Sequence, residues 1–320
     1  MTAPLFATSP ASSAAPGAGD AGAALRIRDL QVGYGSYVLM RQVSFDVRRG
    51  DIFFIMGGSG CGKSTLLHVL MGLKPPQAGS VFFGNVDFWG GTEAVRRDAM
   101  RHAGVLFQSG ALWSSMTLAE NVGLPLQQYT DLDDDEIREL ASLKLALVGL
   151  AGFEEYYPSE ISGGMNKRAG LARALALDPQ ILFLDEPSAG LDPVSSSLLD
   201  ELIQELRDTL GATFVIVSHE LASIFSIATN GIFLDVRTRT VTAKGNPRVL
   251  AQDPHTQEDA LRFLTRGGKD PLQPTAFRVA PHTTPRTGPD AASPAPLPDA
   301  PAGGASAPEA AAPRAKDENA

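Results

Sequence analysis

Residues 52–64 read IFFIMGGSGCGKS, an apolar run followed at once by a glycine-rich turn that ends in lysine and serine. The unbroken apolar run 52–56 is typical of a strand buried on both faces. Residues 64–71, which Gly72 follows, have the pattern of a helix with a glycine stop. The turn at 57–64 fits GxxxxGK[ST], in which glycines let successive backbone N–H groups face a phosphate. The stretch therefore predicts a strand–loop–helix unit that binds a nucleotide phosphate.

The residue types in this loop suggest a role for its individual positions. Lys63 would reach the β- and γ-phosphates of a nucleotide, and the Ser64 hydroxyl would ligate Mg²⁺. Thr65 would add a contact through its side chain or its backbone. The candidate phosphate-binding residues are therefore Gly57, Gly58, Ser59, Gly60, Cys61, Gly62, Lys63, Ser64 and Thr65.

The single cysteine of the chain, Cys61, lies inside this loop. Its position beside a helix N-terminus favours a lowered thiol pKa and greater reactivity. On this interpretation, alkylation would block nucleotide hydrolysis and bound nucleotide would protect against it. The alternative is that Cys61 is a small side chain without a redox role. One cysteine also excludes a disulfide within the chain and is typical of a protein of the reducing cytosol.

Strand and helix patterns alternate along the rest of the chain. Helical stretches at 167–176 and 197–210 each precede a short apolar run that is typical of a buried strand. Such alternation favours a parallel sheet with helices packed on both faces, and we expect one domain with one sheet. The predicted strands are 25–32, 43–47, 52–56, 181–184 and 213–217.

Two acidic residues, Asp185 and Glu186, directly follow the apolar run at 181–184. A buried strand that ends in Asp places a carboxylate at the carboxyl edge of the sheet, where open α/β sheets bind ligands. Asp185 is suited to hold Mg²⁺ through water, as in P-loop hydrolases. Glu186 can polarise a water molecule for attack on the γ-phosphate. The pair thus predicts phosphoryl transfer to water.

The middle of the chain, about residues 109–160, has a mostly helical pattern. Asp133 with Glu136 three residues later has the spacing of a capping box ahead of an amphipathic helix. The acidic run at 131–139 could be a cation site, but acidic residues at a helix N-terminus are favoured by the helix dipole. We interpret this segment as an inserted helical subdomain at about 109–164.

Composition limits the remaining possibilities. The chain has 320 residues and a net charge of −9, which argues against a general nucleic-acid binder. No apolar run approaches the ~20 residues of a membrane-spanning helix, and the first 25 residues lack the features of a signal peptide. Residues 1–24 and 269–320 are rich in Ala, Pro, Ser and Gly and are predicted to be disordered tails around a domain at 25–268.

Residues 161–168, Ile-Ser-Gly-Gly-Met-Asn-Lys-Arg, resemble the signature sequence of ATP-binding-cassette (ABC) ATPases. Residues 25–250 fit that family in the order and spacing of its motifs. The resemblance implies an α/β fold of the ABC type of P-loop NTPase, with a largely parallel sheet, helices on both faces and the inserted helical subdomain. It also implies that the chain binds ATP with Mg²⁺ and hydrolyses it.

The resemblance assigns further residues to the nucleotide. Tyr34 resembles the aromatic residue that stacks on adenine, although Tyr37 competes for that role. Gln108 resembles the glutamine that bridges Mg²⁺ and the attacking water, and His219 resembles the histidine that contacts the γ-phosphate. The remaining family positions are Ser162, Gly163 and Gly164 of the signature and Asp192 of the D-loop at 188–192.

The signature implies a second copy of the chain as a partner. Ser162 and the backbone N–H groups of Gly163 and Gly164 open a helix and form a second anion-binding end. One chain already supplies a complete phosphate loop, so this end has no phosphate of its own. The family solves this with a head-to-tail dimer that sandwiches each ATP between the loop of one chain and the signature of the other.

Two short stretches narrow the resemblance. Both look like the ATPases of Mla/Mce-type lipid transporters. The first comprises residues 106–113, Met116 and 120–122, and the second comprises residues 158–165. Phospholipid movement between the membranes of a diderm bacterium is what this implies, from a position at the cytoplasmic face of the inner membrane. An integral membrane permease, an MCE-type lipid-binding subunit and a small accessory subunit are the implied partners. Ile161 departs from the leucine that is commoner in the family.

Other functions share most of these residues. An ABC importer for a small polar solute, such as an amino acid, would keep every catalytic residue and differ only in its partner. A nucleotide-binding module without transport is a further alternative, although such a module would be expected to lose Glu186 or His219. An apolar cluster after Gln108 would receive a coupling helix of the permease, or would pack as local core; it comprises Ala111, Leu112, Trp113 and Met116.

Overall fold

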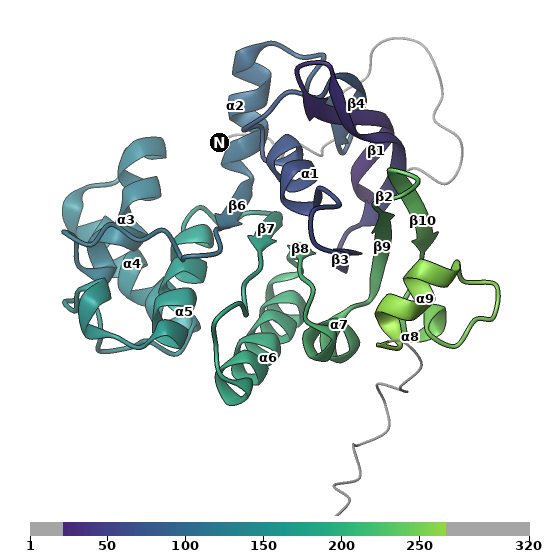
Figure 1. Cartoon of the computed structure of the whole chain (residues 1–320). Helices are drawn as coiled ribbons and strands as arrows, with labels where there is room; N and C mark the ends of the chain where they lie inside the picture. The colour runs from purple at the N-terminus through teal and green to yellow at the C-terminus, as the bar shows by residue number, and fades with distance from the viewer. Residues whose placement is uncertain (1–21, 267–320) are drawn as a thin grey trace, which may run out of the picture. The chain divides into compact units, whose positions relative to one another are not determined.

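Residues 22–266 are described here in a computed structural model (Figure 1). The predicted tails therefore lie outside the described residues, except for 22–24. There the first strand already begins at Ala23, and Ala24 is buried. No helix within 22–266 combines the length and the apolar character that crossing a bilayer would require.

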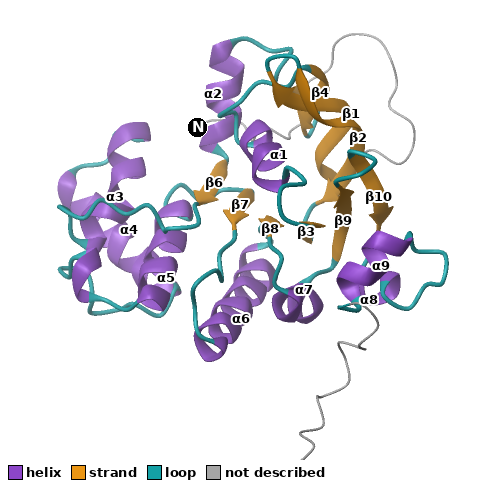
Figure 2. Ribbon diagram, viewed as in Figure 1, coloured by secondary structure: helices purple, strands orange, loops and turns teal. Residues whose placement is uncertain are grey.

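The described strands and helices alternate along much of the chain (Figure 2). The strands are β1 (Ala23–Tyr34), β2 (Tyr37–Arg48), β3 (Ile52–Gly57), β4 (Ala78–Phe83), β5 (Val86–Asp87), β6 (Ala103–Leu106), β7 (Ile181–Asp185), β8 (Thr213–Val217), β9 (Asn230–Asp235) and β10 (Thr240–Lys244). The helices are α1 (Lys63–Leu70), α2 (Glu93–Arg101), α3 (Leu118–Tyr129), α4 (Asp134–Leu147), the 3₁₀ turn η1 (Pro158–Glu160), α5 (Gly163–Ala174), α6 (Pro193–Leu210), α7 (Leu221–Ile227), α8 (Pro247–Leu250) and α9 (Glu258–Leu264).

A six-stranded sheet carries the predicted parallel strands. Its order is β10-β9-β3-β8-β7-β6, and every neighbouring pair from β9 to β6 is parallel, whereas β10 is antiparallel to β9. Strand β3, which leads into the phosphate loop, lies between β9 and β8. This arrangement confirms the predicted α/β fold with a largely parallel sheet.

The expectation of one sheet was wrong, because β1 and β2 belong to a second sheet. This sheet has the order β2-β1-β4-β5 and is antiparallel throughout. Only Gly35 and Ser36 separate β1 from β2, and so short a connection joins antiparallel rather than parallel neighbours. The alternation of apolar and polar residues in both segments, with one face buried, is also typical of an antiparallel sheet.

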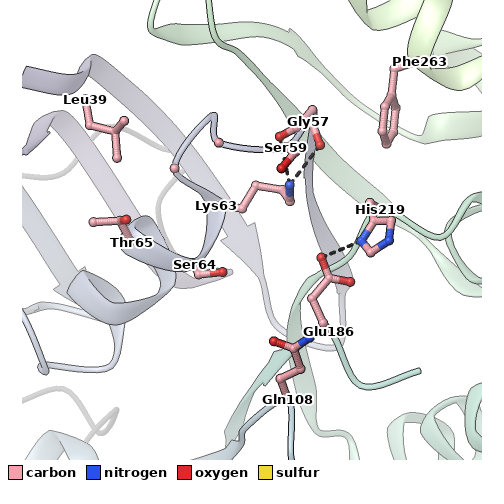
Figure 3. A pocket seen from close by; sticks show the side chains of 13 residues that line it. Leu39, Gly57, Ser59, Lys63, Ser64, Thr65, Gln108, Glu186, His219 and Phe263 are labelled. Carbon is pink, nitrogen blue, oxygen red and sulfur yellow. Dashed lines mark hydrogen bonds and ion pairs between the residues drawn. The ribbon is translucent and has the colours of Figure 1, made fainter. Parts of the chain in front are cut away.

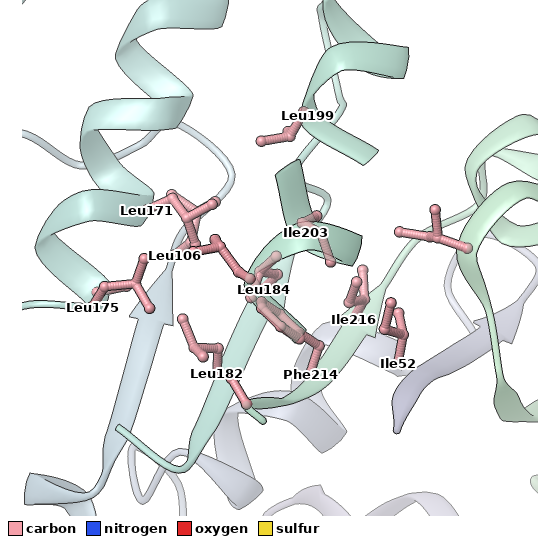
Figure 4. Close-up of a cluster of buried hydrophobic side chains, with 14 of the residues drawn as sticks. Ile52, Leu106, Leu171, Leu175, Leu182, Leu184, Leu199, Ile203, Phe214 and Ile216 are labelled. Carbon is pink, nitrogen blue, oxygen red and sulfur yellow. The ribbon is translucent and has the colours of Figure 1, made fainter. Parts of the chain in front are cut away.

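Two hydrophobic cores lie on opposite faces of the parallel sheet. Alternate residues of β3 enter different cores because successive side chains of a strand point to opposite faces. Phe53 and Ile55 pack into the core that contains the buried face of α1. Ile52 and Phe54 pack into the core that contains α6 and α7, part of which is shown in Figure 4. Helices therefore cover both faces, as predicted.

The segment predicted to be helical contains α3 and α4, and both pack against α5. Each begins with a capping box: Thr117 with Glu120 for α3, and Asp133 with Glu136 for α4. In both boxes the cap side chain accepts a backbone N–H, and the glutamate accepts the N–H of the cap residue. The acidic residues at 133–136 thus serve the start of a helix.

One buried carboxyl group makes the stability of this fold depend on pH. Burial of Asp200 on α6 raises its pKa from 3.8 to about 6, and the negative charges of Glu220 and Glu201 add to the rise. The folded chain therefore holds a proton that the unfolded chain releases, so stability is lost as pH rises from about 4 to about 6. At neutral pH the loss is on the order of 2–3 kcal/mol.

Asp200→Asn is accordingly expected to raise the melting temperature at pH 7.5 and to have little effect near pH 4. The amide has the shape of the acid but carries no charge to bury, so the gain appears only where the wild-type carboxyl ionises. Thermal unfolding at both pH values checks this, with Asp208→Asn at an exposed position of the same helix as the control. An equal effect at both pH values would contradict it.

Candidate functional site

The phosphate loop joins the end of β3 to the start of α1. Gly57 has a φ of 150°, and a Cβ at this position would lie 2.6 Å from both the Leu234 carbonyl oxygen and the Cys61 sulfur. Gly62 caps α1 in the left-handed conformation, with a φ of 98°. Side chains at these two positions would therefore clash or strain the backbone, which explains the glycines in physical terms.

The loop folds around the side chain of Lys63. The Lys63 ammonium donates hydrogen bonds to the carbonyl oxygens of Gly57, at 3.0 Å, and Gly58, at 3.1 Å. Lys63 is only 8% exposed. Two carbonyl acceptors stabilise the buried charge and fix it beside the loop.

A cavity of about 600 Å³ opens at this loop (Figure 3). It brings together parts of the chain that are far apart in sequence, from the loop itself to the segments that follow β6, β7 and β8. Its lining is formed by Leu39, Gly57, Gly58, Ser59, Gly60, Gly62, Lys63, Ser64, Thr65, Gln108, Glu186, His219 and Phe263.

Asp185 ends β7 next to the phosphate loop. The Ser64 hydroxyl donates a hydrogen bond of 3.2 Å to Asp185 Oδ1. Burial raises the pKa of Asp185, the Ser64 hydrogen bond lowers it, and the charge of Glu186 raises it. Two hard oxygen donors thus converge beside the cavity, a chemistry that fits Mg²⁺.

Glu186 and His219 meet across the cavity although 33 residues separate them. His219 Nδ1 lies 2.8 Å from Glu186 Oε1, and Figure 3 shows the contact. The Glu186 side chain is 13% exposed, whereas that of His219 is 68% exposed. Glu186 also has a φ of 48°, an uncommon conformation for a residue with a side chain, and such strain is concentrated at functional sites. The backbone thus turns sharply at the end of β7.

The signature residues and Asp192 lie outside the cavity lining of the described chain. Ser162 caps α5 through its hydroxyl; it is exposed, as is Gly163, whereas Gly164 in the same first turn is half-buried. Asp192 caps α6 and accepts a hydrogen bond from the Ser195 hydroxyl. A Cβ on Gly164 would lie 3.4 Å from Ser195, so the first turns of the two helices are adjacent.

Tyr34 lies beside the cavity but is absent from its described lining. Tyr34 is 56% exposed, and its hydroxyl lies 3.4 Å from Thr65 Oγ1. The Lys74 ammonium lies 4.0 Å from the centre of the ring. Tyr37, the competing aromatic residue, is 54% exposed and carries the Arg239 guanidinium over its ring. The roles of both tyrosines stay predictions.

The expectation of a reactive Cys61 was wrong. Burial raises the pKa of the Cys61 thiol, and the nearby charge of Lys63 opposes this rise only in part. Cys61 is 3% exposed, so its surroundings favour the neutral thiol in spite of the neighbouring helix N-terminus. The structure favours the alternative of a small side chain that packs inside the loop.

We now expect iodoacetamide to alkylate Cys61 in the folded chain at least about tenfold more slowly than in the unfolded chain, because fewer thiolates form and access is blocked. Intact-mass spectrometry measures this directly, since the chain has one cysteine. The same reaction in guanidinium serves as the control. Equal rates in the two states would restore the original expectation.

Sequence reasoning missed two residues that line the cavity, Leu39 and Phe263. Leu39 lies in β2, two residues after Tyr37, and Phe263 lies in α9, well beyond the last candidate residue, His219. Neither residue carries a charge or lies in a pattern that indicates a ligand, so no local signal identified them. Only the fold brings them to the loop.

Comparison with known proteins agrees with this architecture. The family model described as ABC transporter matches residues 40–189. The chain is 42% identical over 200 residues to the probable ribonucleotide transport ATP-binding protein mkl of Mycobacterium leprae, which covers 62% of the chain but only 58% of that protein. It is 36% identical over 249 residues to the intermembrane phospholipid transport system ATP-binding protein MlaF of Haemophilus influenzae, covering 78% of the chain and 93% of that protein.

Solved structures show the same fold. An ATP-binding cassette solved as a dimer in a post-hydrolysis state with ADP and Pi is 27% identical, with a TM-score of 0.63 over 69% of the chain and 98% of that structure. The protein cbiO1 of Clostridium perfringens, part of an ABC transporter complex, is 25% identical, with a TM-score of 0.66 over 77% of the chain and 95% of that structure. The extent of the match to MlaF, together with the phosphate loop and the signature helix, shows that the chain belongs to the ABC transporter family of ATP-binding proteins.

Proposed function

We propose that the chain is the ATP-hydrolysing subunit of a membrane transporter that moves phospholipids between the two membranes of a diderm bacterium. The main support for ATP hydrolysis is that one cavity is lined by the phosphate loop together with Gln108, Glu186 and His219. The cargo rests on the match to MlaF along 93% of that protein's length.

The loop residues supply the binding of ATP. The backbone N–H groups of the loop and the N-terminus of α1 favour the phosphates, and Lys63 adds a positive charge fixed beside them. Ser64 and Asp185 would hold Mg²⁺, with Gln108, which lines the same cavity, as a further ligand. The ion would neutralise charge that develops on the phosphates.

Glu186 is the residue best placed to accept a proton from the attacking water. Its carboxylate lines the cavity and is held by the hydrogen bond from His219. Because the protein does little covalent chemistry in phosphoryl transfer, a fixed carboxylate that orients one water is sufficient. His219, which is far more exposed, would contact the γ-phosphate from the same side.

The exposed N-terminal end of α5, at Ser162 and Gly163, supports a head-to-tail dimer. Ser162, Gly163 and Gly164 lie at a helix N-terminus, yet none is in the described lining of the cavity on their own chain. A second copy would bring its phosphate loop, with bound ATP, to this end, and Asp192 is adjacent through α6. Tyr34 would stack on the adenine at the edge of the cavity. The relative solved as a dimer with ADP and Pi adds support.

A permease would bind at the segment that follows Gln108. Trp113 is 62% exposed and Ala111 is exposed as well, whereas Leu112 packs partly against the core. Trp113 and Ala111 thus fit the expectation of an exposed apolar surface, whereas Leu112 fits the alternative of local core. Through the permease, the subunit would lie at the cytoplasmic face of the inner membrane, with an MCE-type lipid-binding subunit and a small accessory subunit in the same complex.

Transport of a small polar solute is the second candidate. The name of the mycobacterial relative, which includes ribonucleotide transport, favours it, because the identity to that protein is higher over the matched 200 residues. However, the chain spans 58% of that relative and 93% of MlaF. Every residue of the ATP site would be the same in both cases, so only the partners separate them.

A pull-down of the chain from native membranes in mild detergent tests the proposal. We expect mass spectrometry to find a permease, a lipid-binding subunit and bound phospholipid. Trp113→Ala should reduce recovery of the permease by about tenfold or more, because large aromatic residues dominate interface energies. Leu73→Ala, which removes another exposed apolar side chain, is the matched control. A permease recovered with a solute-binding protein and no lipid would overturn the cargo but leave the ATPase.

A further inference from the structure

Lys167 is a buried cation that the proposed mechanism does not use. It belongs to the signature stretch at 161–168, lies one turn into α5 and is 6% exposed. Its ammonium donates a hydrogen bond to the backbone carbonyl oxygen of Gln108. The helix that begins with the signature is therefore tied to the backbone of a residue that lines the ATP cavity.

Helix α5 also holds the residues that follow Gln108, at a second point. The Arg173 guanidinium donates to the carbonyl oxygens of Gly110, at 3.0 Å, and Ala111, at 2.8 Å. Gly170 lies between the two cations, and a Cβ there would come within 3.2 Å of the Gly110 carbonyl oxygen. Two cations and one close approach thus fix the backbone of residues 108–111 against α5.

The surroundings of Lys167 explain why a cation is retained there. Burial lowers the pKa of Lys167, while the negative charges of Asp185 and Glu186 favour its charged form. A buried ammonium is stable only with such compensation. Lys167 thus bonds to the backbone of Gln108 and lies near enough to Asp185 and Glu186 for their negative charges to act on it.

We propose that Lys167 is a positioning residue for Gln108: its hydrogen bond to the Gln108 carbonyl oxygen holds the Gln108 side chain in the ATP cavity and makes residues 108–111 move with the signature helix. The inference rests on the proposed ATPase function. In the proposed dimer, Gln108 would contact the ATP bound to its own chain, whereas the signature would contact the ATP bound to the other chain. Lys167 would link these two elements within one chain.

Lys167→Met tests this, because methionine keeps most of the apolar stem but removes the donor and the charge. We expect kcat for ATP hydrolysis to fall about tenfold or more, with a much smaller change in KM, because misplacement of Gln108 affects the reacting geometry rather than ATP binding. Lys167→Arg should restore most of the rate. Should Lys167→Met fail to fold, Lys167→Ala replaces it and should show the same fall in kcat, since alanine also removes the donor and the charge and favours a helix.

Lys144→Met is the matched control. Lys144 is likewise buried, at 5% exposure, and its ammonium bonds to Asp178 Oδ1 at 2.5 Å. It lies in α4 and makes no recorded contact with residues 108–111 in the described chain. Its loss should lower the melting temperature without selectively reducing kcat.

A double-mutant cycle with Gln108→Ala identifies the route of the effect. If Lys167 acts through Gln108, Lys167→Met should reduce the rate by less than about twofold in the Gln108→Ala background. A full reduction in that background, or an unchanged kcat in the single variant, would overturn the inference.

Hydrogen exchange supplies a readout that does not depend on hydrolysis. The amides of residues 108–111 should exchange faster in Lys167→Met than in the wild type or in Lys144→Met. Unchanged exchange would count against the link between α5 and this loop. If the wild-type chain did not hydrolyse ATP, the proposed function would be overturned instead. The exchange rates of residues 108–111 in Lys167→Met and in the wild type would then still show whether Lys167 holds this segment.

Discussion

Replacing Glu186 by glutamine is expected to reduce ATP hydrolysis by roughly 10²–10⁴-fold while ATP still binds, because a general base typically contributes that factor. The amide keeps an oxygen that can accept the hydrogen bond from His219, which is 2.8 Å long in the wild type. It cannot take a proton from water. The shape of the cavity should therefore persist while the chemistry stops.

The same variant should accumulate as an ATP-bound dimer, since opening would follow hydrolysis. Phosphate release measures the rate, and size-exclusion chromatography with ATP measures the dimer. Glu205→Gln, at an exposed position of α6, is the matched control and should behave as the wild type. A Glu186→Gln chain that stays monomeric when saturated with ATP would contradict the proposed dimer, and one that hydrolyses ATP normally would exclude Glu186 as the base.

Replacing Lys63 by methionine is expected to weaken ATP binding by about 100-fold or more. The ammonium is fixed at 3.0 and 3.1 Å from two loop carbonyl oxygens, so its charge is already positioned for a phosphate. Loss of one or two charge-assisted hydrogen bonds, each worth about 1.5–3 kcal/mol, accounts for this factor. Hydrolysis should fall with binding, in contrast to Glu186→Gln, where binding remains.

Titration with a fluorescent ATP analogue measures the affinity of the Lys63→Met chain. The control is Lys244→Met, which removes an exposed lysine that bonds to the Ser44 carbonyl oxygen. Melting temperatures show whether the loop survives, because Gly57 and Gly58 lose a donor in the variant. Wild-type affinity in a folded Lys63→Met chain would exclude the proposed role of the lysine.

The phosphate loop and the buried strands were predictable because their signals are local. A run such as 52–56 can only be satisfied by burial on both faces, and GxxxxGK[ST] specifies its own backbone shape. The capping box of Asp133 and Glu136 is equally local, and the structure places α4 directly after it. Family resemblance then supplied Gln108 and His219, which have no distinguishing pattern by themselves, and the structure places both at the cavity.

Other features could not be predicted because they depend on contacts between distant segments. The sequence indicated strands at 25–32 and 43–47, but pairing of β1 with β4 decided that they form a separate sheet. The helix N-terminus beside Cys61 suggested a reactive thiol, whereas burial from all sides raised its pKa instead. Desolvation depends on every neighbour, so a local pattern cannot give its size.

The sequence by itself was enough to predict the shape of the phosphate loop and the strand that ends at the Asp185 and Glu186 carboxylates, because those properties follow from backbone shape and apolar patterning within a few residues. Only the tertiary structure decided that Phe263 of α9 reaches the cavity and that Lys167 holds the carbonyl of Gln108. Both contacts join segments dozens of residues or more apart. Their existence depends on how the helices pack on the sheet, and the free energy of that packing is shared among the whole core rather than encoded at either residue.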